Sequence, residues 1–362
     1  MSKNHTEGIL VSKFGFVGIN MLKTFKDILI IKNGKNQKSV ENPEGQYPIY
    51  GSGGIIGFAN NYLCEGNTVV IGRKGSINNP IFVDKPFWNV DTAFGLVTDR
   101  SKMIPKYLYY FCLHFDFNRL NKAVTLPSLT KSDLLKIEID VPDLVVQFKV
   151  ADKLQKVELI INLKKQQLQK FDDLIRARFV EMFGDIKSNS KKWEQVYLKD
   201  ISYLISGGTP SRAKPEYFEG EIPWISTVAL GKTEIGFEDA IEYITKDAIE
   251  NSATKLIPAN SLLFGIRVGV GKVSKNVVPM CTNQDIVSIT NIDDNFNLVF
   301  LKYLLDEYLD FFNGQKRGAT IQGIKSETLK NILVPKVNLK LQNDFEQFVN
   351  QVDKSKYVAP YK

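Results

Sequence analysis

The chain contains one sequence pattern twice, and this duplication restricts its possible folds more than any other feature. Residues 121–157 align with residues 316–352, and Leu134 falls on Leu329. The aligned pairs are Leu126 and Ile321, Leu129 and Ile324, Leu134 and Leu329, Ile137 and Ile332, Leu144 and Leu339, and Gln147 and Gln342. Self-similarity at a nearly constant shift indicates duplicated structural units.

Earlier segments repeat in the same order. GNTVVIGRKG at 66–75 resembles ANSLLFGIRVG at 259–269, and FKDILIIKNG at 25–34 resembles LKDISYLISGG at 198–208. Short apolar, β-rich runs that end in glycine predict several strands in each copy, with a helix after them. Two unrelated domains with similar turn chemistry are the alternative. The shared order favours two α+β modules of one fold.

A single long helix is predicted between the two copies. No glycine or proline occurs from Leu144 to Phe183, Asp143 can cap the start of the helix, and Gly184 can end it. The apolar heptad consists of Leu154, Ile161, Leu168, Ile175 and Met182, with Val150, Val157 and Phe171 on the neighbouring seam position. This pattern predicts a coiled-coil helix roughly 60 Å long. Its apolar stripe needs a partner helix.

The second copy supplies a candidate partner for the stripe. Leu341, Phe345, Phe348, Val349 and Val352 begin a second apolar stripe at residues 337–362. We expect the two helices to lie antiparallel, and the residues expected to pair are Leu154, Val157, Ile161, Leu168, Phe171, Ile175, Phe345, Val349 and Val352. The predicted fold is therefore α+β, with two pseudo-repeated modules joined by long antiparallel coiled-coil helices. The predicted domains are residues 1–142 and 185–336 for the modules and 143–184 and 337–362 for the helices.

The sequence lacks complete motifs for a catalytic site or a metal site. The only histidines are His5 and His114, so neither a zinc cluster nor a hydrolytic triad is expected. The segment from Asn79 to Phe82 reads NPIF and lacks the second proline of an amino-methyltransferase motif. The GKT at Gly231 has serine at position 226, where a phosphate loop has its first glycine. We predict a protein without catalytic residues and without a metal site.

The location of the protein follows from what its sequence lacks. No apolar run approaches the roughly 20 residues that span a bilayer, and the first residues have no signal-peptide layout. The three cysteines are scattered, which argues against a disulfide framework. We expect a cytoplasmic protein with no membrane partner.

Basic loops are the candidate binding sites. The chain carries a net charge of +7; residues 1–142 hold 17 Lys and Arg against 12 Asp and Glu, and residues 185–338 hold 18 against 19. Basic side chains interleaved with glycine can contact phosphates, and Asn, Gln and Arg can read base edges. The candidate DNA-binding residues are Lys32, Lys35, Lys38, Arg73, Lys74, Arg212, Lys214, Arg267, Lys272, Lys275, Gln315, Lys316 and Arg317. Each alone could be an ordinary solvated side chain, but as a set they favour DNA.

These features together resemble a known family, the specificity (S) subunit of Type I restriction–modification systems. The resemblance covers nearly the whole chain. It is carried by YPIYGSGGIIGF and NTVVIGRKGSI in the first copy, by QKRGATIQGIKSETLKNILVPKVNLKLQNDF in the second, and by the long helix from Gln147 to Gly184. Each signal is degenerate alone, whereas the combination is specific.

The resemblance implies a function. Members of the family have two target-recognition domains, each reading one half of a bipartite, asymmetric site in double-stranded DNA. The helices set the gap between the half-sites and dock two methyltransferase (modification) subunits, which restriction subunits then join. The S subunit performs no chemistry. S-adenosylmethionine, ATP and Mg²⁺ belong to the partner subunits, so this chain is expected to bind no cofactor.

One feature departs from the family pattern. By the repeat, Lys362 corresponds to about Gln167, and Pro360 would break a helix. The second helix is therefore expected to be short, which affects the docking of one methyltransferase subunit. The alternative function is a truncated scaffold or inhibitor that binds methyltransferase without productive DNA readout.

Overall fold

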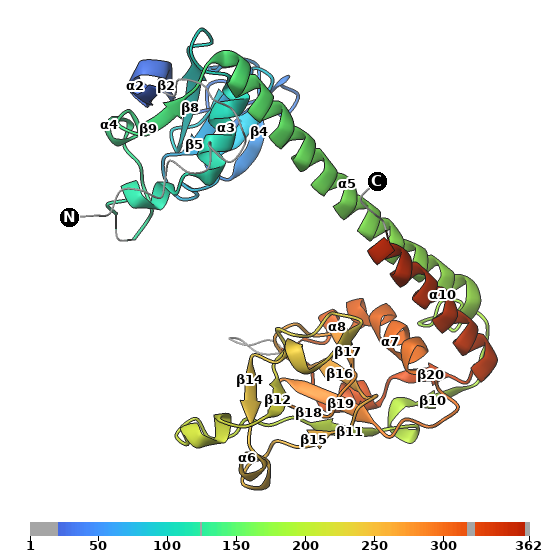
Figure 1. Ribbon diagram of the computed structural model, residues 1–362. Coiled ribbons are helices and arrows are strands. Elements are labelled where there is room, and N and C mark those ends of the chain that lie inside the picture. Colours follow the sequence, from blue (N-terminus) through green and yellow to red (C-terminus); the bar gives the residue numbers. More distant parts are fainter. Residues whose placement is uncertain (1–20, 124, 317–322, 359–362) are drawn as a thin grey trace. The chain divides into compact units, whose positions relative to one another are not determined.

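The computed structural model describes residues 21–123, 125–316 and 323–358, and the chain divides into two compact units, Met1–Lys164 and Lys165–Lys362 (Figure 1). Each unit contains one α+β module. We call the part of the first unit before the long helix the first module, and residues 185–338 the second module. None of the helices among the described residues is long and apolar enough to cross a bilayer.

The first module is built from short strands around one helix. Its strands are β1 (Met21–Thr24), β2 (Leu29–Asn33), β3 (Tyr47–Gly51), β4 (Gly54–Ala59), β5 (Thr68–Gly72), β6 (Ile81–Val83), β7 (Trp88–Asn89), β8 (Ala93–Thr98) and β9 (Glu138–Val141). Its helices are α2 (Phe25–Ile28), α3 (Pro105–His114), η1 (Phe117–Leu120) and α4 (Lys131–Leu134). They form a four-stranded sheet in the order β2-β8-β5-β6, a three-stranded sheet β4-β3-β7 and the pair β1-β9. Leu108 and Cys112 of α3 pack with Val69, Ile71 and Leu96 of the larger sheet to form the core.

The second module has the same plan with additions. Its strands are β10 (Gln195–Tyr197), β11 (Tyr203–Ser206), β12 (Ile222–Ile225), β13 (Glu234–Ile235), β14 (Glu242–Ile244), β15 (Leu256–Ile257), β16 (Leu262–Gly265), β17 (Val273–Asn276), β18 (Met280–Thr282), β19 (Ile286–Thr290) and β20 (Leu333–Pro335). Its helices are η2 (Leu198–Asp200), η3 (Pro215–Phe218), η4 (Phe237–Asp239), α6 (Lys246–Glu250), α7 (Leu298–Glu307), α8 (Leu309–Gly314) and α9 (Ser326–Lys330). The sheet orders are β11-β19-β16-β17-β13, β14-β12-β18-β15 and β10-β20.

The two modules share one framework. The order β2-β8-β5-β6 corresponds to β11-β19-β16-β17, and in both modules a parallel pair (β3 with β7, β12 with β18) lies in the smaller sheet. Phe25 N donates to Ile137 O at 2.9 Å, and the aligned Leu198 N donates to Ile332 O at 2.9 Å. The predicted duplication is thus confirmed in strand order and in individual hydrogen bonds.

The predicted long helix is present as α5 (Leu144–Phe183). Asp143 caps it by accepting a hydrogen bond from Val146 N at 2.9 Å. It ends at Gly184, whose φ of +82° is a left-handed conformation that favours glycine. The predicted start and stop of this helix are therefore confirmed, together with the residues that cause them.

The second long helix, α10 (Leu339–Val358), lies antiparallel to the end of α5 (Figure 1). Near the start of α10, the ring of Phe345 lies 5.3 Å from that of Phe179 and 5.5 Å from that of Phe183. Near the end of α10, Lys356 Nζ lies 2.9 Å from an oxygen of Asp172. The contacts run in opposite directions along the two helices, as predicted.

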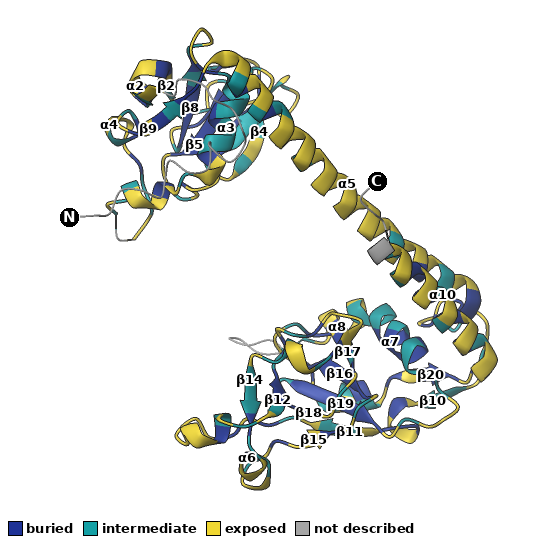
Figure 2. Ribbon diagram, in the orientation of Figure 1, coloured by how far each residue is buried: buried dark blue, intermediate teal, exposed yellow. Residues whose placement is uncertain are grey.

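The predicted stripe is covered over part of its length. Ile175, Phe345, Val349 and Val352 are buried in one core with α7, and Phe171 packs against that core. Leu154, Val157, Ile161 and Leu168 are exposed, by 36%, 51%, 48% and 45%, along the yellow stretch of α5 in Figure 2. The pairing predicted for these four residues is not made within the part of the chain that the structure describes, and it stays a prediction.

Candidate nucleic-acid interface

Two loops of the first module meet at residues 89–93, which we call the first junction segment. One loop follows β2 and the other follows β5, and both contain predicted DNA-binding residues. Their backbone hydrogen bonds to the segment are Gly34 N to Ala93 O (3.1 Å), Lys35 N to Asn89 O (2.9 Å) and Arg73 N to Thr92 O (2.7 Å). Loops that are distant in sequence are thereby held together by main-chain contacts, which do not depend on loop side chains.

The second module repeats the arrangement at residues 282–286, the second junction segment. The loops that follow β11 and β16 contact it. The corresponding hydrogen bonds are Gly207 N to Ile286 O (3.0 Å), Gly208 N to Thr282 O (2.8 Å) and Ile266 N to Asp285 O (2.8 Å). All three bonds join positions that match those of the first module.

Close backbone approach at both segments explains a glycine in each loop. A Cβ on Gly34 would lie 1.7 Å from Val90 O, and one on Gly207 would lie 2.1 Å from Asn283 O. Any side chain would force the loop off the segment. These glycines therefore serve the framework, and Gly208 does so as well, because a Cβ there would lie 2.4 Å from the backbone carbonyl carbon of Ala253.

The loop after the central strand is also held from its other side. Leu129 N donates to Arg73 O at 2.9 Å, and Ile324 N, its partner in the repeat, donates to Ile266 O at 2.8 Å. The apolar side chains of Leu129 and Ile324 are buried. The segment before α4 or α9 therefore anchors in the core and fixes the basic loop.

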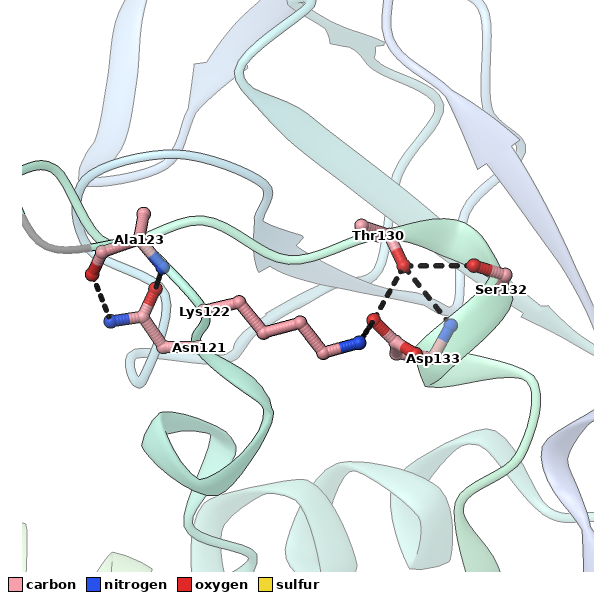
Figure 3. Close-up of polar contacts among 6 residues, drawn as sticks. All are labelled: Asn121, Lys122, Ala123, Thr130, Ser132 and Asp133. Carbon is pink, nitrogen blue, oxygen red and sulfur yellow. Dashed lines mark hydrogen bonds and ion pairs between the residues drawn. The ribbon is translucent and has the colours of Figure 1, made fainter.

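In the first module this anchoring segment has its own polar supports (Figure 3). Asn121 Nδ2 donates to Ala123 O at 3.1 Å, while Lys122 Nζ lies 3.0 Å from an oxygen of Asp133. Thr130 Oγ1 donates to the same carboxylate at 2.8 Å. The hydrogen bonds from Lys122 and Thr130 lower the pKa of Asp133. The carboxylate thus ties the two ends of the segment together.

Three of the predicted DNA-binding cations of the first module have no carboxylate partner among the described residues. Arg73 and Lys74 are exposed. Arg73 Nη1 donates to the carbonyl of Asp91 at 3.3 Å, and its guanidinium lies 5.8 Å from the ring of Phe94. Neither contact neutralises the guanidinium. Within the described chain, no carboxylate lies within ion-pair distance of Arg73, Lys74 or Lys35.

In the second module, Arg212, Arg267 and Lys275 are paired with carboxylates. Arg212 donates to both oxygens of Glu242, from Nη2 at 2.8 Å and also from Nη1, and lies 4.2 Å over the ring of Phe218. This hydrogen bonding raises the pKa of Arg212 and lowers that of Glu242. Ion pairs also join Arg267 to Asp285 at 3.5 Å and Lys275 to Glu234 at 3.0 Å. The two modules therefore present different charge patterns on the same framework.

Comparison with known proteins shows which family this framework belongs to. The family model for the Type I restriction modification DNA specificity domain matches residues 20–171 and again residues 190–357. The chain belongs to this family. It is a specificity subunit of the Type I restriction–modification kind, the non-catalytic component of such systems. The double match coincides with the internal repeat.

Two specificity subunits illustrate the similarity over most of the chain. The EcoR124I/EcoR124II specificity subunit of Escherichia coli is 27% identical over 335 residues, covering 83% of this chain and 77% of that protein. A putative Type I specificity subunit of Haemophilus influenzae, S.HindORF215P, is 26% identical over 336 residues, covering 87% and 82%. Because each match covers more than four-fifths of this chain, the similarity extends into both modules.

Solved structures show the same fold. The S subunit of a Type I restriction–modification system from M. genitalium covers 94% of this chain with 90% of its own, at a TM-score of 0.55 and 16% identity. A structure described as the basis of complex assembly and conformational transition of the type I R-M system gives a TM-score of 0.54 at 15% identity, covering 94% and 91%. At such low identity the agreement concerns architecture.

The structure divides the predicted DNA-binding residues of this specificity subunit into groups. Lys32 is half-buried and donates from Nζ to Leu63 O at 3.1 Å, so it supports the fold of its loop. Lys214 donates to the hydroxyl of Tyr217 at 2.8 Å, a bond that raises the pKa of Lys214. The exposed residues are Lys35, Lys38, Arg73, Lys74, Arg212, Lys214, Arg267, Lys272 and Gln315. Lys275 and Lys316 are half-buried, and Arg317 lies outside the described residues.

Sequence reasoning did not single out two polar side chains at the second junction segment. Thr209 Oγ1 donates to the side-chain oxygen of Gln284, and the pair lies beside the ion pair of Arg267 and Asp285. An amide can recognise adenine in the major groove, which makes Gln284 a candidate reader. No local sequence signal marks Gln284, because the loop contacts that define its segment are formed by residues distant in the chain.

Proposed function

We propose that this specificity subunit reads a bipartite, asymmetric site in double-stranded DNA, one half-site per module. One observation carries the proposal: the duplicated framework brings two loops together at an equivalent junction segment in each module. Main-chain hydrogen bonds hold the loops, so their side chains can differ without loss of the fold. A conserved framework with variable exposed loops is what two different half-sites require.

The uncompensated cations of the first module give a direct test. We expect replacement of Arg73 and Lys74 by alanine to weaken DNA binding at every sequence and to reduce the salt slope of log K by about 1.8, because each phosphate contact contributes about 0.9. Binding is measured by fluorescence anisotropy at several salt concentrations. Replacing the exposed Lys26 and Lys85 by alanine removes the same charge elsewhere on the module and is the matched control. Equal slopes for both double variants would exclude Arg73 and Lys74 from the interface.

An exchange of modules tests whether each module reads one half-site. Replacing residues 1–142 by the first module of another specificity subunit should change one half-site of the methylated sequence and leave the other. The methylated sites are mapped by sequencing DNA modified by the reconstituted complex. A change in both half-sites would contradict the one-module, one-half-site proposal.

The exposed part of α5 supports a second element of the proposal, the docking of two methyltransferase subunits to which restriction subunits then bind. Leu154, Val157 and Ile161 occupy heptad positions, yet they are exposed. An apolar seam of this kind buries itself against a helix of another chain. We propose that the modification subunit supplies that helix in the cytoplasm, and that the partners bind S-adenosylmethionine, ATP and Mg²⁺. Capture of methyltransferase without any binding of DNA would favour the scaffold or inhibitor instead.

A further inference from the structure

A completely buried glutamine lies in the first turn of α5. Gln147 has no exposed surface, although its amide carries two donors and an acceptor. Its Oε1 accepts from Ile104 N at 2.8 Å, and its Nε2 donates to Lys102 O at 2.9 Å and to Pro142 O at 2.8 Å. Every hydrogen of the side-chain amide is therefore used. The partners come from the segment that begins α3 and from the residue that leads into α5.

The aligned residue in the first turn of α10 makes the same three bonds. Gln342 is also completely buried. Its Oε1 accepts from Asn297 N at 2.8 Å, and its Nε2 donates to Asn295 O at 3.0 Å and to Val337 O at 2.7 Å. Asn297 is the N-cap of α7, as Ile104 is the N-cap of α3. The duplication has therefore kept a complete hydrogen-bond set and not just a residue type.

Other polar contacts between module and long helix differ in the two halves. In the first, the hydroxyl of Tyr110 donates to Glu158 at 2.9 Å. In the second, Asn297 Nδ2 donates to Glu346 at 2.7 Å and to Asn343 at 3.0 Å. The glutamine is thus a polar contact that both joints share.

We propose that Gln147 and Gln342 are positioning residues that fix the direction in which each module leaves its own long helix, and thereby the gap between half-sites that the subunit accepts. This inference rests on the proposed reading of a bipartite site. The physical reason is that apolar contacts tolerate sliding and rotation, whereas three directional bonds from one buried amide are satisfied in one arrangement.

The chemistry of the site ranks the possible replacements. Methionine has a similar length and volume but makes none of the three bonds, so one amide hydrogen and two carbonyl oxygens become unsatisfied. Glutamate can still accept from Ile104 N, yet an ionised carboxylate would face the carbonyls of Lys102 and Pro142. Glutamate should therefore disturb the joint at least as much as methionine does.

The first experiment measures the joint without DNA. Nitroxide labels are placed in the full chain on cysteines introduced at the exposed positions Lys85 and Gln155, since the native cysteines are buried. Pulsed electron resonance then gives the distance distribution between first module and helix. We expect a narrow distribution in the parent and a broader or shifted one in Gln147→Met. The exposed Gln166→Met is the control and should leave the distribution unchanged.

The second experiment measures the consequence in DNA. The reconstituted methyltransferase complex is given a library in which both half-sites are constant and the gap varies by up to three base pairs about its preferred length. Loss of this buried hydrogen-bond set costs at least about 1.4 kcal/mol, which corresponds to a factor of ten in an equilibrium constant. We therefore expect Gln147→Met to lower the preference for DNA with the correct gap, relative to other gap lengths, about tenfold. The bases required in each half-site should stay the same.

The outcomes separate the two proposals. If the parent complex shows no half-site requirement, the proposed function fails, while the label distances still test the joint. An unchanged distance distribution together with unchanged gap preference in Gln147→Met would overturn the positioning role. Should that variant not fold, Gln342→Met with labels at Lys246 and Gln351 repeats the test in the second module. Failure of both variants to fold would also overturn it, because the glutamines would then be requirements for folding.

Discussion

The same positions of the repeat are buried in α10 and exposed in α5. Val349 and Val352 are 1% and 6% exposed, whereas their counterparts Leu154 and Val157 are 36% and 51% exposed. Phe345 is completely buried, whereas the aligned Val150 is half-buried. All of these residues lie on an apolar stripe of a regular helix. The heptad therefore specifies an apolar surface that can be buried. Whether it is buried depends on whether another segment packs against it.

The neighbour of the α10 stripe is the end of α5. The ring of Phe345 lies 5.3 Å from that of Phe179, 5.5 Å from that of Phe183 and 5.4 Å from that of Tyr303. These rings meet at angles of 73° to 88°, which suits edge-to-face packing. Leu154, Val157 and Ile161 of α5 belong to no buried hydrophobic cluster among the described residues. The two stripes therefore have the same apolar spacing but differ in the segment that packs against them.

The largest effect should come from removing the ring at the centre of the α10 cluster. Phe345→Ala leaves a cavity among three aromatic rings and should lower the free energy of unfolding of the second unit by about 3–5 kcal/mol. The matched change, Val150→Ala, should cost less than about 1 kcal/mol because the side chain is half-exposed. Hydrogen exchange of α10 peptides measures the first change, and that of α5 peptides measures the second. Similar losses would show that the two stripes are equally covered.

A smaller effect is expected where the stripe is exposed, and it should concern association instead of folding. Leu154→Asp combined with Ile161→Asp should weaken binding of the methyltransferase subunit at least about 100-fold, or roughly 2.7 kcal/mol, because two charges would enter an apolar seam. The free energy of unfolding should change by less than about 0.5 kcal/mol. The control is Gln155→Asp combined with Gln166→Asp, which adds the same charge at exposed polar positions. If both double variants bind equally well, the stripe is not the docking surface.

The local parts of this fold could be predicted from the sequence. The absence of glycine and proline from Leu144 to Phe183, the capping Asp143 and the terminating Gly184 are local signals, and the helix has those bounds. The duplication could be predicted as well, because residues that serve a core recur at constant spacing. Leu129 and Ile324 are such a pair, and they make equivalent backbone bonds.

The parts that depend on distant contacts could not be predicted. Arg212 and Glu242 form an ion pair although they are 30 residues apart in the sequence, and no local sequence signal near either residue predicts it. The convergence of basic loops on a junction segment depends on strand order, which periodicity does not reveal. The sequence also could not show which half of the α5 stripe would be covered, because both halves carry the same apolar spacing.

The smallest expected effect lies at the end of the covered seam, where the repeat places Lys356 on the position of the exposed Ile161. Lys356 Nζ lies 2.9 Å from Asp172 of α5 and 2.8 Å from Asp353 of its own helix. Burial alone would lower the pKa of Lys356, but hydrogen bonds to Asp353 and Asp172 outweigh it and raise the pKa above 10.5. The ion pairs therefore stabilise the folded form of the charged lysine.

Replacing Lys356 by methionine should lower the free energy of unfolding of the second unit by about 0.5–1 kcal/mol at neutral pH. Because the pKa is raised on folding, the contribution is complete below the unfolded value of 10.5 and is lost as the pH rises through the folded value. The difference in unfolding free energy between the parent and Lys356→Met should thus be constant from pH 7 to 10 and shrink above pH 10.5. The control is Lys354→Met at an exposed neighbouring position. Its unfolding free energy should differ from that of the parent by less than about 0.3 kcal/mol at every pH. Denaturant unfolding at each pH gives these differences. A difference that did not shrink above pH 10.5 would mean that folding does not favour the charged lysine and that these ion pairs do not hold α10 to α5.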